Sequence, residues 1–205
     1  MNSYKEHLRI LILGSNGQLG RSLKASLTNT NHEIFSASRK DFDLLNNNDI
    51  NLIKQFVPDL IINCAAYTQV DLAESNQDLA MQVNAFALEK LTVEAKKLGS
   101  VFIHFSTDYV FNGEYQKPLN ENDIKEPLSV YGISKFAGEN IIKNSGINYY
   151  IFRVGWLYSE YSHNFVKSII TKGLSENSLK VVNDQFGSPT SSYFIADAIN
   201  HLIQN

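Results

Sequence analysis

Three glycines follow an apolar run near the N-terminus at three-residue spacing. The run covers residues 8–13, and Gly14, Gly17 and Gly20 come next in the segment GSNGQLG. An apolar run of this length that ends at glycine predicts a strand buried on both faces of a parallel sheet. The glycines allow a tight turn and a close approach of backbone to a ligand, and the helix expected from residue 17 to 27 points its N-terminus there. The segment predicts a pyrophosphate-binding turn, with an ordinary strand-to-helix turn as the alternative.

The rest of the chain alternates between short apolar runs and segments with helical spacing. Strands are predicted over residues 8–13, 32–37, 60–62, 101–105, 149–152 and 179–182, and helices over 17–27, from a cap at 46–49 to 56, and over 78–98, 130–143, 163–171 and 194–203. This alternation predicts an α/β fold with a doubly wound parallel sheet. The 205 residues suffice for one well-buried domain.

Composition argues against several classes of protein. The net charge is -3 and no basic block is present, so we expect no nucleic-acid partner. The single cysteine, Cys64, excludes an internal disulfide and a multi-cysteine metal site, and the five histidines show no metal-ligand spacing. The first apolar run is too short for a signal peptide or a membrane span. We therefore expect a cytoplasmic protein with no membrane partner and no metal.

A second constellation lies far downstream of the glycine turn. Tyr131 precedes Lys135 by four residues on the helix predicted after the fourth strand, so the two lie on one face. The lysine charge favours the phenolate and should lower the pKa of Tyr131 from about 10 toward neutrality. Such a tyrosine can donate a proton to a carbonyl oxygen. The alternative is a surface tyrosine beside a solvated lysine.

A hydroxyl at the end of the preceding strand would complete this site. Ser106 and Thr107 are both available, and we assign Thr107 to orient the substrate, Tyr131 to act as the acid, and Lys135 to tune it and anchor a cofactor. A nucleotide turn combined with a proton donor for a ketone predicts hydride transfer from a nicotinamide.

The end of the second predicted strand bears on the choice of nicotinamide. Residues 36–40 contain no acidic side chain that would bond a ribose 2′-hydroxyl, and Arg39 could contact a 2′-phosphate. NADPH is therefore favoured, although NADH stays open because Arg39 could be an ordinary surface charge. Asp43 and Leu44 are placed to meet the adenine. The small residues that follow the third strand, within 63–67, suit close passage of backbone beside the cofactor.

Several segments together resemble one family. They are GSNGQLG, NCAAYTQVDLAE, VNAFA, FSTDYVFNG, PLSVYGISKFAGE, FRVGWLY and VVNDQFGSPT. In order and spacing they resemble the dTDP-4-dehydrorhamnose reductases, extended short-chain dehydrogenase/reductases of dTDP-rhamnose and polysaccharide biosynthesis. The resemblance implies reduction by NADPH of the C4 ketone of dTDP-4-dehydro-6-deoxy-L-mannose to give dTDP-L-rhamnose. Members usually continue well beyond the point where this chain ends, so most of the C-terminal substrate lobe is expected to be absent.

The resemblance also assigns roles to residues. Tyr131 would be the proton donor, Lys135 would hold the nicotinamide ribose, Thr107 and Asp108 would meet the sugar, and Trp156 would pack near it, although ordinary packing is as good an interpretation of Trp156. The expected cofactor-binding set is Gly14, Asn16, Gly17, Gln18, Leu19, Gly20, Arg39, Asp43, Leu44, Ala65, Ala66, Tyr67, Thr68, Tyr131 and Lys135. Residues 1–205 would form an NAD(P)-binding Rossmann domain, with 156–191 on the substrate side. A homodimer is possible.

Other proteins share this scaffold. Nucleotide-sugar 4,6-dehydratases share the tyrosine–lysine pair but resemble one another in carrying a glutamate directly after the Thr-Asp pair, where this chain has Tyr109, which argues against dehydration. A 4-epimerase, or a reductase of a related nucleotide sugar, is possible in principle. A non-catalytic, NADP-binding regulatory protein of the reductase-like type is the alternative from another class, and the complete set of Thr107, Tyr131 and Lys135 argues against it.

Overall fold

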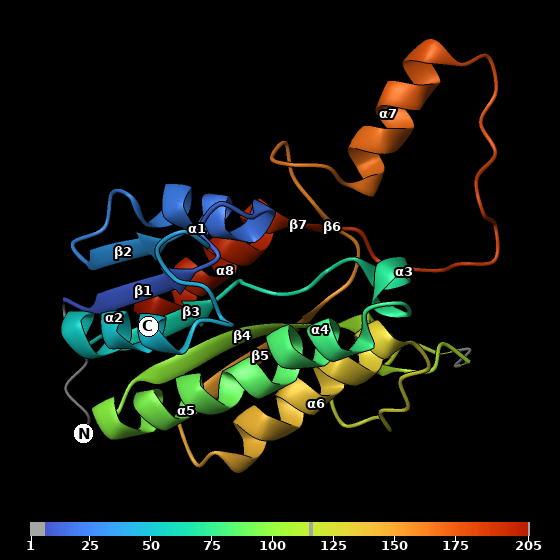
Figure 1. Ribbon diagram of the computed structural model, residues 1–205. Helices are drawn as coiled ribbons and strands as arrows, with labels where there is room; N and C mark the ends of the chain where they lie inside the picture. The colour runs from blue at the N-terminus through green and yellow to red at the C-terminus, as the bar shows by residue number, and fades with distance from the viewer. Residues whose placement is uncertain (1–6, 115–116, 205) are drawn as a thin grey trace.

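The chain folds around a parallel sheet of five strands, in the order β2-β1-β3-β4-β5 (Figure 1). The structure, a computed structural model, describes residues 7–114 and 117–204. The strands are β1 (Arg9–Leu13), β2 (Glu33–Ala37), β3 (Leu60–Asn63), β4 (Val101–Thr107) and β5 (Tyr149–Val154), and each neighbouring pair is parallel. Because the chain moves to one side of β1 for β2 and to the other side for β3, the carboxyl end of β1 is a topological switch point. Open α/β sheets bind ligands at such points. The predicted doubly wound fold is confirmed.

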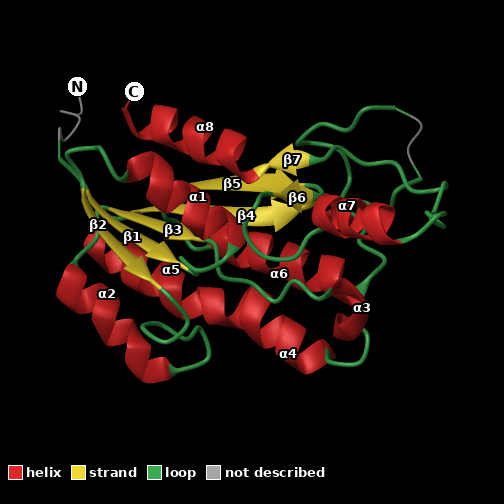
Figure 2. Cartoon of the chain, turned by 90° about the horizontal axis from the view of Figure 1, so that it is seen from above, coloured by secondary structure: helices red, strands yellow, loops and turns green. Residues whose placement is uncertain are grey.

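Helices cover both faces of the sheet (Figures 1 and 2). α1 (Gln18–Leu27) and α8 (Ser192–Gln204) cover one face, and α2 (Ile50–Phe56), α5 (Ala87–Leu98) and α6 (Val130–Asn144) cover the other. Alternate residues of β1 serve the two cores: Ile10 and Ile12 pack toward α1 and α8, while Leu11 and Leu13 pack toward α2 and α5. Burial on both faces explains why the strand is a continuous apolar run.

One predicted helix is interrupted. The segment predicted as a single helix over 78–98 consists of α4 (Gln77–Met81), a π-helical turn η2 (Gln82–Phe86) and α5. Shorter elements are η1 (Asn47–Asp49), α3 (Val70–Ala73) and η3 (Asp108–Val110). A π-turn carries one extra residue per turn and often marks a functional position.

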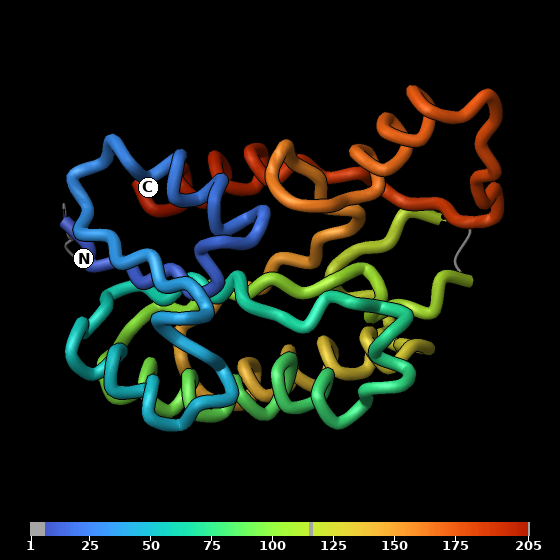
Figure 3. Tube along the Cα trace, turned by 45° about the horizontal axis from the view of Figure 1, so that its top comes forward, coloured from blue at the N-terminus to red at the C-terminus, as the bar shows by residue number. Residues whose placement is uncertain are grey.

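The chain leaves the body of the molecule after β5 and then returns. β6 (Leu157–Tyr158) pairs in parallel with β7 (Thr190–Ser191), and α7 (Phe165–Ser175) and a long loop lie between them. Figures 1 and 3 show this segment, in orange, projecting from the sheet before α8 packs beside α1. The strand predicted over 179–182 is wrong: these residues form loop, with Val181 52% and Val182 60% exposed. Their β-branched side chains favour a strand only where a neighbouring strand provides packing.

Within the described residues, no helix has the length and apolar character needed to cross a membrane.

Candidate active site

A cleft of about 1120 Å³ opens at the carboxyl ends of the strands. Every residue predicted from the sequence to bind cofactor or substrate, or to act in catalysis, lines it. These are Gly14, Asn16, Gly17, Gln18, Leu19, Gly20, Arg39, Asp43, Leu44, Ala65, Ala66, Tyr67, Thr68, Thr107, Asp108, Tyr131, Lys135 and Trp156. The fold thus brings the glycine turn and the Tyr131 helix, far apart in sequence, to the walls of one cavity.

The glycine turn is built for close backbone approach. Gly14 has a φ of 74°, and a Cβ there would lie 2.7 Å from the Ala65 nitrogen on the neighbouring loop. A Cβ on Gly20 would lie 2.4 Å from the Gly14 oxygen. The N-cap residue of α1 is Gly17, which has no side chain to accept hydrogen bonds from the N–H groups of the first turn. Such a helix end attracts an anion such as a pyrophosphate.

Gln18 ties this turn to the projecting segment. Its Oε1 accepts a hydrogen bond from Ser159 Oγ and another from Asn164 Nδ2, both at 2.9 Å. Asn164 in turn caps α7 by accepting a hydrogen bond from the Lys167 N–H at 3.1 Å. The first residue of α1 therefore fixes the start of α7, a role the sequence pattern does not reveal.

Arg39 lies at the rim of the cleft, beyond the end of β2. Its side chain is 80% exposed, and its Nε lies 3.2 Å from Asp43 Oδ2. A backbone hydrogen bond from Leu45, followed by Arg39, lowers the pKa of Asp43 against the opposing effect of burial. An exposed guanidinium at the cleft rim remains accessible to an anionic group on a ligand.

Tyr131 is linked to the end of β4. Thr107 acts on the Tyr131 hydroxyl, and its Oγ1 donates to Asp108 Oδ1 at 3.0 Å and accepts the Tyr109 N–H at 3.2 Å. The Tyr109 ring stands edge-on to that of Tyr131, with centroids 5.7 Å apart. Burial raises the pKa of Tyr131 to about 12, with Asp108 adding to the rise and the Thr107 hydrogen bond opposing it. This direction is opposite to the lowering expected from the sequence.

Lys135 is not among the groups that shift the pKa of Tyr131, and its side-chain nitrogen has a different neighbour. The side chain is 1% exposed, and Nζ lies 3.2 Å from Nε2 of His104 on β4. Burial lowers the pKa of Lys135 to about 8, and Glu139 one turn further along acts in the opposite direction. In this structure the charge of Lys135 therefore does not produce the lowering of the Tyr131 pKa that the sequence predicted.

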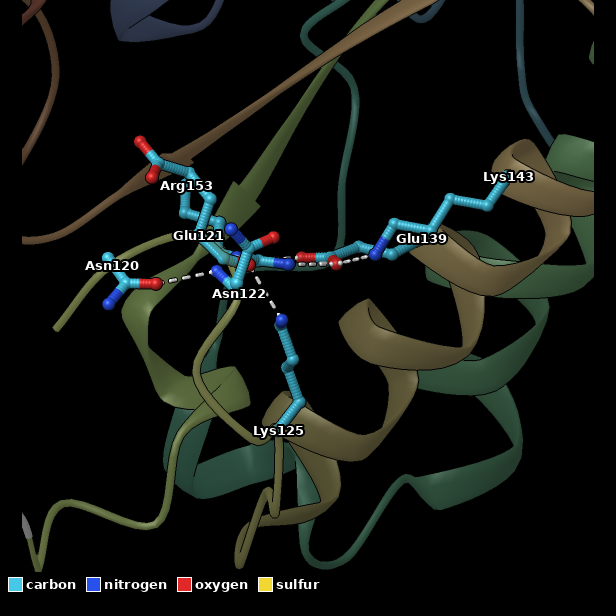
Figure 4. A network of polar contacts seen from close by, with 7 residues as sticks. All are labelled: Asn120, Glu121, Asn122, Lys125, Glu139, Lys143 and Arg153. Atoms are coloured by element: carbon cyan, nitrogen blue, oxygen red, sulfur yellow. Dashed lines mark hydrogen bonds and ion pairs between the residues drawn. The ribbon is translucent and has the colours of Figure 1, made fainter.

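Glu139 anchors α6 to the neighbouring strand and loop (Figure 4). Its buried carboxylate accepts hydrogen bonds from Arg153 Nε at 2.8 Å and Nη2 at 2.6 Å, and from Lys143 Nζ at 2.9 Å. Burial acts to raise the pKa of Glu139, but these hydrogen bonds lower it to about 2. Arg153 Nη1 also donates to the Glu121 carbonyl at 3.3 Å, so the loop before α6 is held too.

Trp156 sits at a strained corner beside the cleft. It has a φ of 46°, and its ring packs edge-on against Phe165 at 5.4 Å. A Cβ on Gly187 would lie 2.6 Å from its indole, and a Cβ on Gly155 would lie 2.6 Å from Asp108 Oδ2. The absence of a side chain at Gly187 thus lets the returning loop pack against the Trp156 indole, and Gly155 leaves room for the Asp108 carboxylate.

Two residues of the site escaped the sequence analysis because they act through distant partners. Asn84, in the π-turn, bonds both backbone groups of Tyr67 and donates to Ser134 Oγ at 3.0 Å. Asn63, at the end of β3, bonds His104. No local spacing signals either role.

Cys64 lies in the wall of the cleft, where burial raises the pKa of its thiol. A thiol with a raised pKa is a poor nucleophile. Among residues 7–114 and 117–204, no three His, Cys, Asp or Glu side chains are grouped so that they could hold a metal ion.

The fold and the lining of the cleft define a nucleotide-binding α/β protein with a tyrosine–lysine centre. The chain belongs to the family described as RmlD substrate binding domain, whose sequence model matches residues 8–205. It is 36% identical over 201 residues to the dTDP-4-dehydrorhamnose reductase of Salmonella typhimurium. That match covers 96% of this chain and 67% of the relative, so the chain spans about two thirds of its length.

Solved structures agree with this assignment. A dTDP-4-dehydrorhamnose reductase from Clostridium acetobutylicum superposes with a TM-score of 0.91 at 41% identity, over 95% of this chain and 70% of that one. The reductase from Bacillus anthracis in complex with NADP gives a TM-score of 0.92 at 38% identity, over 98% of this chain and 71% of that one. The resemblance predicted from the motifs is confirmed.

Proposed function

We propose that this chain is an NADPH-dependent dTDP-4-dehydrorhamnose reductase, which reduces the C4 ketone of dTDP-4-dehydro-6-deoxy-L-mannose to give dTDP-L-rhamnose. The observation that carries the proposal is the single cleft that joins the glycine turn to Thr107, Tyr131 and Lys135. The relatives named above carry this activity in their names. Tyr109 in place of a glutamate separates the chain from the dehydratases.

The residues present fit a nicotinamide dinucleotide. At Gly14 and Gly20 the turn has room only for backbone, and the start of α1, which has no side-chain cap, suits the pyrophosphate. Arg39 at the rim suits a 2′-phosphate, which favours NADPH, and the Bacillus anthracis relative is in complex with NADP. The loop at residues 65–68 would hold the remaining cofactor groups. When bound, NADPH supplies the hydride.

The side chains of this protein would manage the proton and the ketone. Tyr131 donates its phenolic proton to the carbonyl oxygen as the alcohol forms, and solvent then returns a proton to it. A pKa raised to about 12 keeps this proton in place before the reaction. Thr107 would orient Tyr131 and the substrate ketone, because its hydroxyl already interacts with Tyr131 and donates a hydrogen bond to Asp108. Lys135 holds the ribose and stabilises the phenolate once it is charged.

The proposal extends to the surroundings of the site. Residues 156–191 would contribute part of the substrate side, since Trp156 and Phe165 line the cleft. We also propose that the protein works in the cytoplasm, as expected from the sequence. A homodimer stays a prediction.

The test is NADPH oxidation with the sugar generated in place by an upstream epimerase. Tyr131→Phe should lower turnover roughly a hundredfold or more. The control is Tyr150→Phe, on the exposed amino end of β5, which should retain activity. Tight NADPH binding without turnover in the unmodified protein would instead support a binding protein or a need for further substrate-binding structure.

A further inference from the structure

Three buried side chains form a line of hydrogen bonds beneath the cleft. Asn63, His104 and Lys135 come from β3, β4 and α6, and each is 1% exposed. Asn63 Nδ2 lies 3.2 Å from His104 Nδ1, and His104 Nε2 lies 3.2 Å from Lys135 Nζ. The Ala65 N–H donates to Asn63 Oδ1 at 3.1 Å. The line thus runs from the backbone beside the glycine turn to the nitrogen of the proposed ribose-binding lysine.

The direction of these hydrogen bonds follows from the Ala65 N–H, which can only donate. It requires the amide oxygen of Asn63 on its side and therefore turns the amide NH₂ toward His104. His104 Nδ1 must then accept, so a neutral imidazole carries its proton on Nε2 and directs it at Lys135. Only an unprotonated amine can accept that proton.

The opposite arrangement leaves two donors facing each other. An ammonium at Lys135 would need His104 Nε2 to accept, which places the imidazole proton on Nδ1, against the NH₂ of Asn63. Rotating the amide moves the clash to the Ala65 N–H instead. A buried donor without an acceptor is destabilising, so the line has one favoured direction.

We propose that Asn63 and His104 are positioning residues that favour the free amine of Lys135 over its ammonium form, and that Lys135 takes up a proton when the anionic cofactor binds to this amine form. The role of Lys135 toward a cofactor rests on the proposed function. The direction of the hydrogen bonds among Asn63, His104 and Lys135 is a property of the protein alone. Coupling of this kind would deliver the positive charge at the moment when the ribose and the phenolate need it.

The ionisable groups around His104 and Lys135 affect which of these two side chains carries a charge. Burial lowers the pKa of His104 well below its usual value, which keeps the imidazole neutral, and a charged Lys135 would lower it further. Burial lowers the pKa of Lys135 to about 8. Glu139, on the same helix, opposes this, but Arg153 from β5 pairs with its carboxylate. Tyr131, with its pKa raised to about 12, is uncharged.

The first test is ¹⁵N NMR of histidine-labelled protein without cofactor. At about pH 9, above the pKa that burial gives Lys135, His104 should show a protonated Nε2 and an unprotonated Nδ1. On lowering the pH, this pattern and the Lys135 ammonium signal should change together. His104→Gln identifies the signal among the five histidines. A native His104 with its proton on Nδ1 at this pH would overturn the inference.

The second test reverses the line with Asn63→Asp. A carboxylate accepts from both Ala65 N–H and His104 Nδ1–H, which moves the imidazole proton to Nδ1 and lets Lys135 be an ammonium. NADPH binding is then measured at about pH 9 by calorimetry in buffers of different ionisation enthalpy. Binding to Asn63→Asp should take up about one proton fewer than binding to the native protein. Equal uptake in both proteins would contradict the proposal.

Asn140→Asp is the matched control, because it adds the same charge on the exposed face of α6. It should change neither the His104 pattern nor proton uptake. If NADPH fails to bind the native protein, the proposed function falls, and the NMR pattern still decides the state of the line.

Discussion

Asn84 and Tyr67 exchange two hydrogen bonds across the rear of the cleft. Asn84 Oδ1 accepts the Tyr67 N–H at 2.8 Å, and its Nδ2 donates to the Tyr67 carbonyl at 3.0 Å. The same Nδ2 donates to Ser134 on α6 at 3.0 Å. One amide in the π-turn therefore holds the loop that carries Tyr67 and the helix α6 in a fixed relation. A Cβ on Gly138 of α6 would lie 2.2 Å from the backbone oxygen of Asn84, so the π-turn and α6 are in direct backbone contact.

Asn84→Ala should loosen this junction. Each buried group that loses its partner costs about 1–3 kcal/mol of stability, and the loop carrying Tyr67 should lose order. We expect a lower urea midpoint and weaker NADPH binding, measured by fluorescence titration. Asn140→Ala, on the exposed face of α6, should change neither quantity. Unaltered NADPH affinity in folded Asn84→Ala would show that the loop is held by other contacts.

Much of this architecture is predictable from local sequence. The strands are buried on both faces, so β1, β3 and β4 are plain apolar runs, and a glycine turn after β1 indicates the switch point. All predicted site residues line the cleft because the carboxyl ends of parallel strands meet at one edge. The catalytic helix is predicted to within one residue at its C-terminus, as residues 130–143 against Val130–Asn144.

What escaped prediction depends on long-range partners. Asn84 and Tyr67 are 17 residues apart, and Asn63 and His104 are 41 apart, so no periodicity links them. The π-turn adds a single residue to one turn, a shift too small to be recognised in the hydrophobic spacing of residues 78–98. The pKa of Tyr131 depends on burial and on where Lys135 points, and neither follows from a four-residue spacing. The prediction of a strand over residues 179–182 is wrong because, in the described part of the chain, no strand lies beside these residues to pair with them.

Glu139 should make stability depend on pH in the acid range. Its pKa is lowered from 4.5 to about 2 on folding, so its contribution is fully present above 4.5 and is lost as the pH falls toward 2. Glu139→Gln should lower the free energy of unfolding by roughly 3 kcal/mol near neutral pH, because Arg153 loses its buried partner. Urea unfolding at a series of pH values should show this difference shrinking in that window.

The exposed Glu89→Gln variant provides the comparison, since it removes a carboxylate from the surface of α5. Its free energy of unfolding should follow that of the native protein at every pH. A Glu139→Gln deficit that persists unchanged at pH 2 would mean that packing, not charge, causes the loss.

Arg39 should set the preference between the two nicotinamide cofactors. Arg39→Ala removes the exposed guanidinium at the rim, and losing a charge-assisted hydrogen bond of about 1.5–3 kcal/mol weakens binding at least tenfold. We expect this loss for NADPH and little change for NADH, by titration of each. Lys40→Ala, next in sequence but outside the cleft lining, serves as the control. An equal loss for both cofactors would exclude a contact with the 2′-phosphate.

Gly187 should matter because of its contact with Trp156. Gly187→Ala would place a methyl group 2.6 Å from the indole, so the ring or the loop must move. If residues 156–191 form part of the substrate side, the KM for the sugar should rise several-fold while NADPH affinity stays constant. Trp156 is the only tryptophan of the chain, so its fluorescence should report the displacement directly.

Gly173→Ala gives the matched change on α7, where the added carbon meets Leu179 at an ordinary 3.8 Å. It should leave the fluorescence and the KM as they are, and it should slightly stabilise the helix because alanine favours helix over glycine. A shift in Trp156 fluorescence without any change in KM would show that the corner at Trp156 does not take part in substrate binding. It would then assign Trp156 to packing, the alternative that the sequence left open.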